Sequence, residues 1–305
     1  MPNGDSDAAP PRVLLVEDSP IQAKVVMAKL SAAWDGALPA HAASLSEAIE
    51  ALRAAAAFDC VLLDLGLPDA DGLEALKRIR ALAPEIAIVV LSGDEDETLA
   101  FLAVREGAQD YLVKGQVGDG HIARAILYAI ERKRQEAELI HQAYFDGLTA
   151  LPNRRQFAEQ LELAVQRLQR RPDPLALLYG DLDGFKRIND RLGHAVGDEV
   201  LVEVGARLRR SVRRGDLVAR LGGDEFVVLC ESAGLAQAEE VAARARAAIA
   251  DPMIAGGEPV VISASFGIAT ALAADTDAGA LLAAADAAMY AEKASSGLAR
   301  LRASA

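Results

Sequence analysis

Five short apolar segments within the first 115 residues constrain the fold of this chain more than any other feature. Each is followed by a stretch that favours a helix, and the first helix has Ser19 as N-cap and Pro20 in its first turn. Strands that alternate with helices form a doubly wound α/β domain with a parallel sheet. We predict strands over residues 12–16, 39–43, 60–63, 86–91 and 110–113, with helices from residue 19 and over about 46–56, 73–82 and 95–106.

Polar side chains stand where these strands end. They are Glu17, Asp18, Asp64, Ser92 and Lys114. The carboxyl ends of parallel strands meet at one edge of a sheet, which is where ligands bind in such folds. Three carboxylates there repel each other unless a cation lies among them, and Mg²⁺ is the expected cation because it prefers oxygen ligands. A carboxylate beside Mg²⁺ and Lys114 can attack a phosphoryl group. The plainer alternative, a solvated polar rim, is disfavoured because five positions agree.

This pattern resembles the receiver domain of bacterial response regulators through Glu17, Asp18, Asp64, Ser92, Tyr111 and Lys114. The resemblance implies that Asp64 accepts a phosphoryl group from a sensor histidine kinase and that the acidic residues hold the metal. It also implies that Ser92, Tyr111 and Lys114 form the switch that reports phosphorylation. We place the receiver domain at residues 12–120, after a disordered N-terminal segment over 1–11.

Residues 121–144 contain neither Gly nor Pro and predict one long helix that links two domains. Apolar residues from Ala123 to Tyr144 form a seam of about three heptads, which Lys133 interrupts. A solvated linker helix and a weak parallel coiled coil both fit this pattern. The coiled coil is favoured if the second domain has to dimerise in order to work.

A β-hairpin is predicted at residues 216–230. The apolar segments 216–219 and 226–230 flank the pair Gly222-Gly223, which is typical of a tight turn. Asp224 and Glu225 follow the glycines, so the tip carries two carboxylates beside backbone that a ligand can approach closely. Such a tip suits a divalent metal and a phosphate, although alone it is also typical of an ordinary polar turn.

Other stretches complete a resemblance to the GGDEF domain of diguanylate cyclases, over roughly residues 144–295. We place this domain at 145–305 and expect an α+β, nucleotide-cyclase-like fold. Strands are expected over 175–182, 260–263 and 265–269, and helices to about 171 and over about 200–210, 236–250 and 278–294. The motifs begin at Asp146 (DxLT), Asn153 (NR), Asp181 (DxDxFK), Asn189 (ND), Gly193 (GH), Gly197 (GD), Arg220 (RxGGDEF), Ser265 (SxGIA) and Asp286 (DxxMYxxK).

This resemblance implies a site for GTP. Asp181 and Asp224, with the Leu182 carbonyl, would hold Mg²⁺, or alternatively Mn²⁺, against the triphosphate. Asp224 or Glu225 would accept the proton of the attacking 3′-hydroxyl group. Asn189 and Asp198 would read the guanine edge. Lys186 and Lys293 would contact phosphate. The implied GTP-binding residues are Phe185, Lys186, Asn189, His194, Asp198 and Lys293.

Two further features concern the affinity for nucleotides. The family usually continues with Gly-Arg-Asn after Lys293, but here residues 294–298 differ and Arg300 is the nearest arginine, which lowers the expected affinity for triphosphate. Arg213 and Asp216 match the RxxD inhibitory motif of the family. They imply a second site for the product cyclic di-GMP, with Arg244 or Arg246 of a neighbouring domain as the partner arginine.

Composition limits the remaining alternatives. The net charge of −13 argues against DNA binding. Cys60 and Cys230 lie in apolar runs and are expected to be buried thiols in a reducing compartment. There is no apolar run long enough for a membrane span and no signal-peptide core at the N-terminus, so we expect a cytoplasmic protein without membrane insertion.

Together these features predict a phosphorylation-controlled diguanylate cyclase, the output of a two-component system, which condenses two GTP into cyclic di-GMP and two pyrophosphates. Because each domain would hold one GTP, the active form is expected to be a homodimer. The alternative is a module that binds GTP or cyclic di-GMP without turnover.

Overall fold

The computed structural model describes residues 9–54, 58–93, 97–115, 118, 120–171, 173–272 and 277–303, with residues 97 and 296–303 described by their backbone alone. The chain forms two compact units, Met1–Leu139 and Ile140–Ala305. Residues 1–8 of the predicted disordered segment lie outside the described residues, and residues 9–11 are in neither a helix nor a strand.

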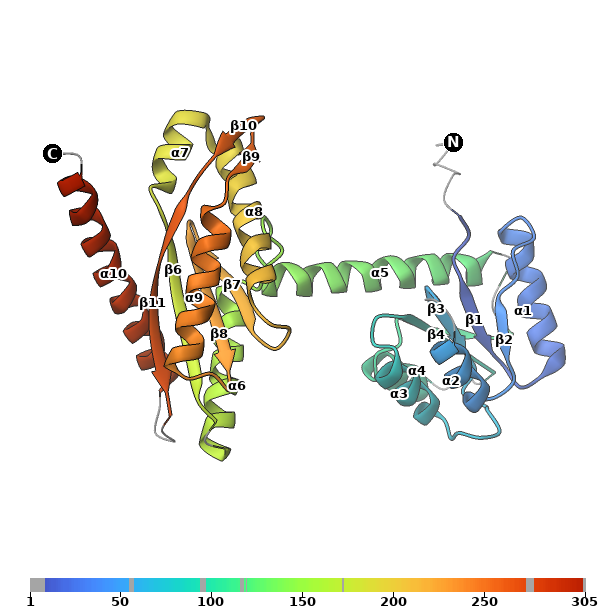
Figure 1. Cartoon of the computed structure of the whole chain (residues 1–305). Coiled ribbons are helices and arrows are strands. Elements are labelled where there is room, and N and C mark those ends of the chain that lie inside the picture. The colour runs from blue at the N-terminus through green and yellow to red at the C-terminus, as the bar shows by residue number, and fades with distance from the viewer. Residues whose placement is uncertain are drawn as a thin grey trace. The chain divides into compact units, whose positions relative to one another are not determined.

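The first unit contains a five-stranded sheet in the order β2-β1-β3-β4-β5, with every neighbouring pair parallel (Figure 1). This confirms the predicted doubly wound domain. Residues 55–56 and 95–96 of two predicted helices lie outside the described residues. The elements are β1 (Val13–Val16), α1 (Pro20–Ala33), β2 (Ala40–Ala42), α2 (Leu45–Ala54), β3 (Cys60–Leu63), α3 (Leu73–Leu82), β4 (Ala87–Ser92), α4 (Glu97–Arg105), β5 (Asp110–Val113) and the start of α5 (His121–Tyr144).

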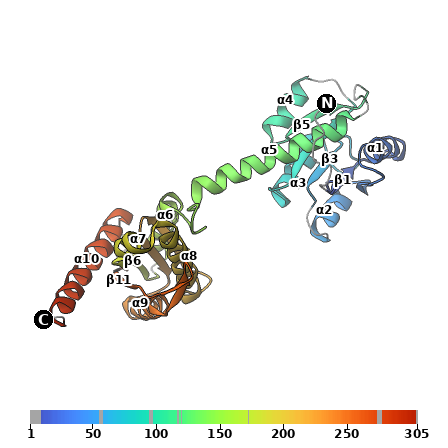
Figure 2. The same cartoon turned by 90° about the horizontal axis from the view of Figure 1, so that it is seen from above.

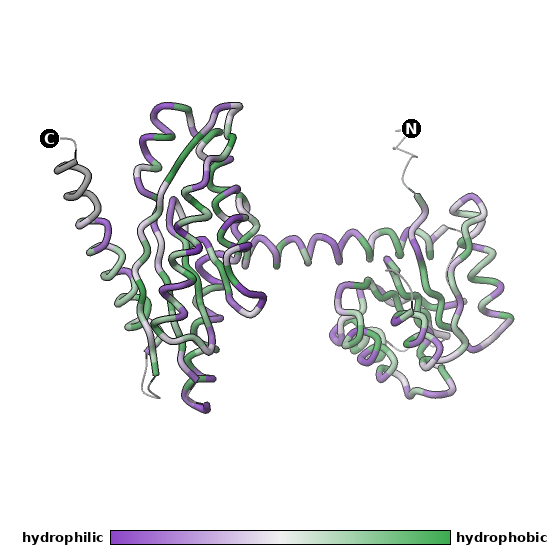
Figure 3. Tube along the Cα trace, in the orientation of Figure 1, coloured by the Kyte–Doolittle hydropathy of each residue, from purple (hydrophilic) through white to green (hydrophobic). Residues whose placement is uncertain are grey.

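The central strands of this sheet are apolar throughout because helices cover both of their faces. Leu14 and Val16 of β1 pack in one cluster with α2 and α3, whereas Val13 and Leu15 pack in another with α1 and α5. Figure 3 shows these hydrophobic residues concentrated along the strands. The packing therefore leaves the polar residues that follow each strand at the carboxyl edge of the sheet.

The loop that follows Asp64 is tied to α2 by Asp69. The Asp69 carboxylate accepts hydrogen bonds from the backbone nitrogens of Leu45 and Ser46 at 2.8 and 2.9 Å, and from the Ser46 hydroxyl at 2.8 Å. These backbone hydrogen bonds lower the pKa of Asp69. Because Asp69 lies far along the chain from α2, it caps the helix from another loop and connects the Asp64 loop to a rigid element.

Helix α5 begins against the sheet of the first unit. Ile122, Ile126 and Ala129 are buried there. Farther along, Leu139 and Ile140 are 66% and 53% exposed, so this part of the helix presents apolar side chains that the chain itself does not cover.

The second unit is built on a four-stranded sheet in the order β11-β6-β8-β7, and all its neighbours are antiparallel. Helices α6 and α10 cover one face, and α8 and α9 cover the other (Figures 1 and 2). A short hairpin, β9-β10, stands apart from this sheet. The elements are α6 (Arg154–Arg170), β6 (Leu175–Asp183), α7 (Phe185–Leu192), α8 (His194–Ser211), β7 (Leu217–Gly222), β8 (Glu225–Glu231), α9 (Leu235–Ala250), β9 (Met253–Ala255), β10 (Glu258–Val260), β11 (Ser263–Ala271) and α10 (Ala278–Ala303).

Three details of the second unit differ from the prediction. Residues 185–192 form a helix of their own, and the helix expected over 200–210 starts at His194, because Gly193, with φ +87°, allows a sharp break between the two helices. The strand expected over 265–269 lies within β11, which is longer because it pairs with β6 along nine residues. The separate strand expected over 260–263 is wrong, because Val260 belongs to β10 and Ser263 begins β11. Helix α10 runs to Ala303 instead of ending near residue 294.

Gly267 explains why α10 lies so close to the sheet. A Cβ atom at this position would lie 2.0 Å from the Met289 nitrogen and 2.1 Å from the Ala285 carbonyl oxygen. Backbone atoms cannot move aside as a flexible side chain can, so only glycine allows the helix to pack directly on β11. This contact brings the end of α10, with Lys293, towards the end of β6.

Candidate functional sites

Acidic side chains converge at the carboxyl edge of the first unit. Carboxylate oxygens of Glu17, Asp18 and Asp64 lie within 4.8 Å of one another. Lys114 Nζ lies 2.7 Å from Glu17 Oε2 and 2.9 Å from Asp64 Oδ2. Burial and the Asp64 carboxylate raise the pKa of Glu17 despite its contact with Lys114. The ionised cluster therefore keeps an excess of negative charge, which a divalent cation would offset.

The predicted switch residues lie on the two neighbouring strands. Ser92 is buried at the end of β4, and Tyr111 is half-buried in β5. The Lys114 backbone nitrogen donates to the Ser92 carbonyl at 2.8 Å, so the lysine is fixed to β4 by its backbone while its side chain reaches the acidic cluster. The structure thus brings Glu17, Asp18, Asp64, Ser92 and Lys114 to one edge of the sheet, whereas Tyr111 in β5 lies farther back, opposite Val90.

In the second unit, two arginines hold the tip of the β7-β8 hairpin. Arg220 donates from Nε and Nη2 to the Gly223 carbonyl at 3.1 and 2.8 Å, and from Nη1 to Asp146 Oδ1 at 2.8 Å. Arg154 Nε donates to the Leu221 carbonyl at 3.3 Å. Gly223 has φ +53°, a backbone conformation that favours glycine. The DxLT and NR motifs therefore support the hairpin from the start of the domain.

The hairpin tip meets the end of β6 and the end of α10. The Leu182 nitrogen donates to the Asp224 carbonyl at 3.3 Å, and Lys293 Nζ forms an ion pair with Asp181. Burial and the nearby Asp224 raise the pKa of Asp181 although Lys293 binds it. Although burial opposes the change, Asp181 and Asp224 raise the pKa of Lys293. Both pKa shifts indicate that the site carries more negative charge than one lysine neutralises. Such a site fits a divalent cation.

Glu225 has different surroundings from Asp224. Its carboxylate lies 3.5 Å from Arg154 Nη2 and accepts a hydrogen bond from the Tyr179 hydroxyl. Burial, followed by the charge of Glu225, raises the pKa of Tyr179 to about 12. Sequence reasoning missed Tyr179, because a tyrosine in an apolar strand reads as a core residue. Only the register, which pairs Asp181 with Glu225, places it beside a carboxylate.

The predicted guanine-reading residues lie on α7 and α8. Within the described parts of the chain, Asn189 Oδ1 is buried and accepts no hydrogen bond. Gly197 makes room for this amide, since a Cβ atom there would lie 1.8 Å from Asn189 Oδ1. Asp198 is exposed on the same helix. A buried carbonyl oxygen that accepts no hydrogen bond fits a ligand that offers N–H groups, as guanine does.

Three other predicted nucleotide-binding residues also lie on α7 and α8. Phe185 is buried at the start of α7, whereas Lys186 and His194 are exposed. Arg300 lies in the part of α10 that is described by its backbone alone.

The predicted inhibitory residues pair with each other. Arg213 Nε donates to Asp216 Oδ1 at 3.0 Å, and Arg213 also donates to the Glu231 carbonyl. Both residues line a cavity of about 250 Å³. Of the two partner arginines proposed, Arg246 forms an ion pair with Glu292 at 2.8 Å, whereas Arg244 Nε donates to the Ser211 carbonyl.

Two further observations concern the chain as a whole. Cys60 and Cys230 are free and buried, and burial raises the pKa of each thiol to about 12, so neither is poised to react. Over the described residues, each helix is too short or too polar to traverse a lipid bilayer.

Known proteins match both units. Residues 13–126 match the response regulator receiver domain, and residues 143–297 match the family described as diguanylate cyclase, GGDEF domain. The chain is 47% identical over 162 residues to the diguanylate cyclase TpbB of Pseudomonas aeruginosa, covering 52% of this chain and 37% of that protein. It is 32% identical over 297 residues to the response regulator PleD of Caulobacter vibrioides, covering 93% of this chain and 64% of PleD.

A solved structure resembles the second unit. It is the coiled coil and GGDEF domain of DgcB from Caulobacter crescentus in complex with c-di-GMP, with a TM-score of 0.51 and 26% identity over 55% of this chain and 91% of that one. With coverages of 37% and 64%, the chain spans less than two thirds of the length of TpbB and of PleD. Because the GGDEF match spans more than half of the sequence, the chain belongs to the GGDEF family, and it carries an N-terminal response regulator receiver domain.

Proposed function

We propose that this chain is a diguanylate cyclase whose rate is set by phosphorylation of its receiver domain. The observation that carries this proposal is the meeting of Asp181, Asp224 and Lys293 at the hairpin tip. The buried Asn189 Oδ1, which accepts no hydrogen bond within the described residues, adds a candidate contact for guanine. Both features support a metal site and a guanine site within one domain of the GGDEF family.

The reaction consists of two equivalent steps. In each, the 3′-hydroxyl oxygen of one GTP bonds to the α-phosphorus of the other, the bond to the β-phosphate bridge breaks, and pyrophosphate leaves. Asp224 or Glu225 accepts the hydroxyl proton. The two steps close the ring of cyclic di-GMP. Because each domain holds one GTP, two domains must face each other across a two-fold axis.

The other residues of the site have three roles, which are metal binding, phosphate binding and recognition of guanine. Asp181, Asp224 and the Leu182 carbonyl would hold Mg²⁺, or Mn²⁺, which would neutralise charge on the triphosphate. Lys186 and Lys293 contact phosphate as positive charges. Asn189 can accept and donate at the guanine edge and Asp198 accepts there, in a pattern that adenine does not match. Phe185 and His194 support the nucleotide.

Control begins at Asp64. Its carboxylate oxygen attacks the phosphorus of a phosphohistidine on a sensor kinase, the phosphorus–nitrogen bond breaks, and imidazole leaves. Glu17 and Asp18 would hold Mg²⁺ with Asp64, while Lys114 balances charge and Ser92 and Tyr111 respond. A receiver dimer, extended through the exposed apolar part of α5, would raise the fraction of facing cyclase domains. Because GTP and such kinase domains are found in the cytoplasm, we expect the activity to be cytoplasmic.

Product identification tests the proposal. The purified chain is incubated with GTP and Mg²⁺, and the nucleotides are identified by mass spectrometry. We expect cyclic di-GMP and pyrophosphate in a ratio of one to two, and no corresponding product from ATP. Binding of GTP without any turnover would instead make the second domain a binding module and contradict the proposal.

Product inhibition gives a second prediction. We propose that Arg213 and Asp216 bind cyclic di-GMP, since arginine can fork onto guanine O6 and N7. Arg244 is the preferred partner arginine, because Arg246 is bound to Glu292. Arg213→Ala should raise the product concentration for half inhibition by about tenfold or more without changing the initial rate. Arg170→Ala, an exposed arginine on α6, serves as control. Equal inhibition of Arg213→Ala and the parent would rule out the site.

A further inference from the structure

Arg246 joins three elements of the second unit at one point. From α9 its Nη2 donates to both carboxylate oxygens of Glu292 on α10, at 3.0 and 2.8 Å, and to the Phe266 carbonyl on β11 at 3.2 Å. Its guanidinium also lies 5.7 Å from the centre of the Phe266 ring. One side chain therefore ties a helix on each face of the sheet to the same strand.

Phe266 connects this point to the metal site. It is buried and lies opposite Gly180 in the β11-β6 register, so that the next pair is Ser265 with Asp181. A Cβ atom on Gly180 would lie 2.4 Å from the Phe266 ring, so the ring occupies the space beside the backbone that precedes Asp181. The environment of Arg246 thus extends to the residue next to a proposed metal ligand.

The end of α10 depends on polar contacts. Met289 is the last described residue of this helix with a buried side chain, and Tyr290, Ala291, Ala294 and Ser295 are exposed. Between them, Glu292 binds Arg246 and Lys293 binds Asp181. Apolar packing therefore fixes α10 only as far as Met289. The next turn, which carries Lys293, is held by these two ion pairs and by a hydrogen bond of 3.5 Å from the Phe266 backbone nitrogen to Glu292 Oε1.

We propose that Arg246 and Glu292 are positioning residues that fix Lys293 beside Asp181, a placement that the chain needs in order to bind the triphosphate. The part that concerns GTP rests on the proposed function. The placement of Lys293 does not, because it concerns the protein without nucleotide. Removing either partner frees the turn of α10 over residues 290–295 and lets Lys293 leave Asp181.

Lysine labelling tests the placement directly. The intact chain is treated with acetic anhydride, and the acetylation rates of Lys293 and of the exposed Lys186 are compared by mass spectrometry. In the parent, Lys293 should react slowly, since its ammonium group must leave Asp181 and lose a proton before the amine can attack the anhydride. Arg246→Met and Glu292→Gln should each raise its rate relative to Lys186 by about threefold or more. Unchanged relative rates in both variants would overturn the proposal.

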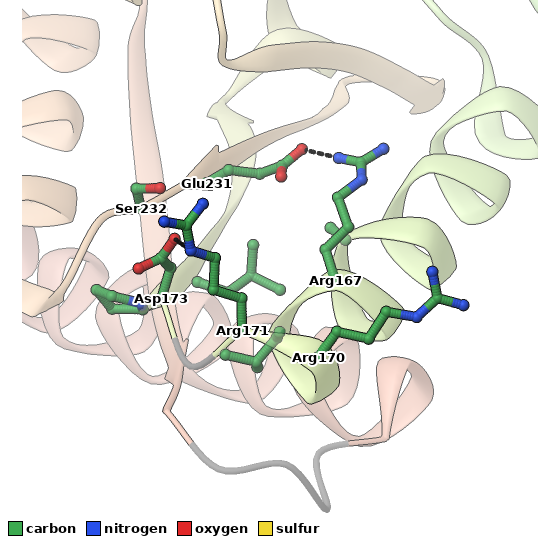
Figure 4. Close-up of a pocket in the computed structure, with 10 residues that line it drawn as sticks. Arg167, Arg170, Arg171, Asp173, Glu231 and Ser232 are labelled. Carbon is green, nitrogen blue, oxygen red and sulfur yellow. Dashed lines mark hydrogen bonds and ion pairs between the residues drawn. The ribbon is translucent and has the colours of Figure 1, made fainter.

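Arg167→Met is the matched control. Arg167 forms an ion pair with Glu231 between α6 and β8 and lines a separate cavity with Arg170 and Arg171 (Figure 4). It is thus also an arginine that bridges two elements, but it lies away from Lys293. Its substitution should leave the labelling of Lys293 unchanged. An equal rise in this control would mean that general loosening, not positioning, is responsible, and would contradict the proposal.

Nucleotide binding tests the consequence. Calorimetry with Mg²⁺ and a non-hydrolysable GTP analogue should give a Kd about tenfold higher for Arg246→Met than for the parent. The double reversal Arg246→Glu with Glu292→Arg should recover much of the affinity, which a merely destabilised protein would not do. If Arg246→Met and Glu292→Gln both bound the analogue with the Kd of the parent, this consequence would be overturned. If the parent itself bound no analogue, the proposed function would fail, while the labelling result would still decide the placement.

Discussion

Asp224→Ala is expected to lower the rate of cyclic di-GMP formation by about a thousandfold or more, while the second unit remains folded. Asp224 lies at the turn of the β7-β8 hairpin, and its charge raises the pKa of Asp181. Without it, the metal site loses one of its two carboxylates, and the charge that develops on the transferred phosphoryl group is less well stabilised. The fold should persist because Arg220 holds the turn through the backbone carbonyl of Gly223.

The measurement is an initial rate by mass spectrometry, with circular dichroism to verify folding. Glu231→Gln provides a control at the opposite end of the same strand. This half-buried residue is the acidic partner of Arg167, and the loss of that ion pair should leave the rate within about twofold of the parent. A folded Asp224→Ala protein that turns over GTP as fast as the parent would refute the assignment of the hairpin.

The strands of the first unit could be predicted because burial on both faces makes them continuous apolar runs. The β6, β7 and β8 strands were found for a similar reason. Two short elements were missed: α7, and the β9-β10 hairpin that takes Val260 away from β11. In both places the local sequence is compatible with several structures. The outcome depends on tertiary contacts, such as the packing of Gly197 against Asn189.

In the candidate site, too, the residue types could be predicted from the sequence, whereas their contacts could not. Motif spacing identified the carboxylates and lysines because their chemistry requires those residue types. The family resemblance implied that Asp181 and Asp224 lie together at one metal site, but it did not imply that Glu225 contacts Arg154 and Tyr179. Nor did it predict that Arg246 would bind Glu292. Such contacts arise between elements far apart in sequence, and strand register and helix packing decide them.

Asp64→Asn is expected to remove the response of the cyclase to phosphorylation but not its basal activity. An amide cannot accept the phosphoryl group, yet it has nearly the same size as the carboxylate. Lys114 keeps its contact with Glu17 at 2.7 Å, so the receiver should remain folded. The cyclase residues lie in the other compact unit, and the substitution does not alter them. In the parent, phosphorylation should raise the rate by about fivefold or more.

The most direct test of a receiver-controlled cyclase is the initial rate of cyclic di-GMP formation from GTP and Mg²⁺, with and without acetyl phosphate, in the parent and in Asp64→Asn. We predict that acetyl phosphate accelerates only the parent and that both proteins have the same basal rate. Equal acceleration of both proteins, or no cyclic di-GMP from either, would contradict the account.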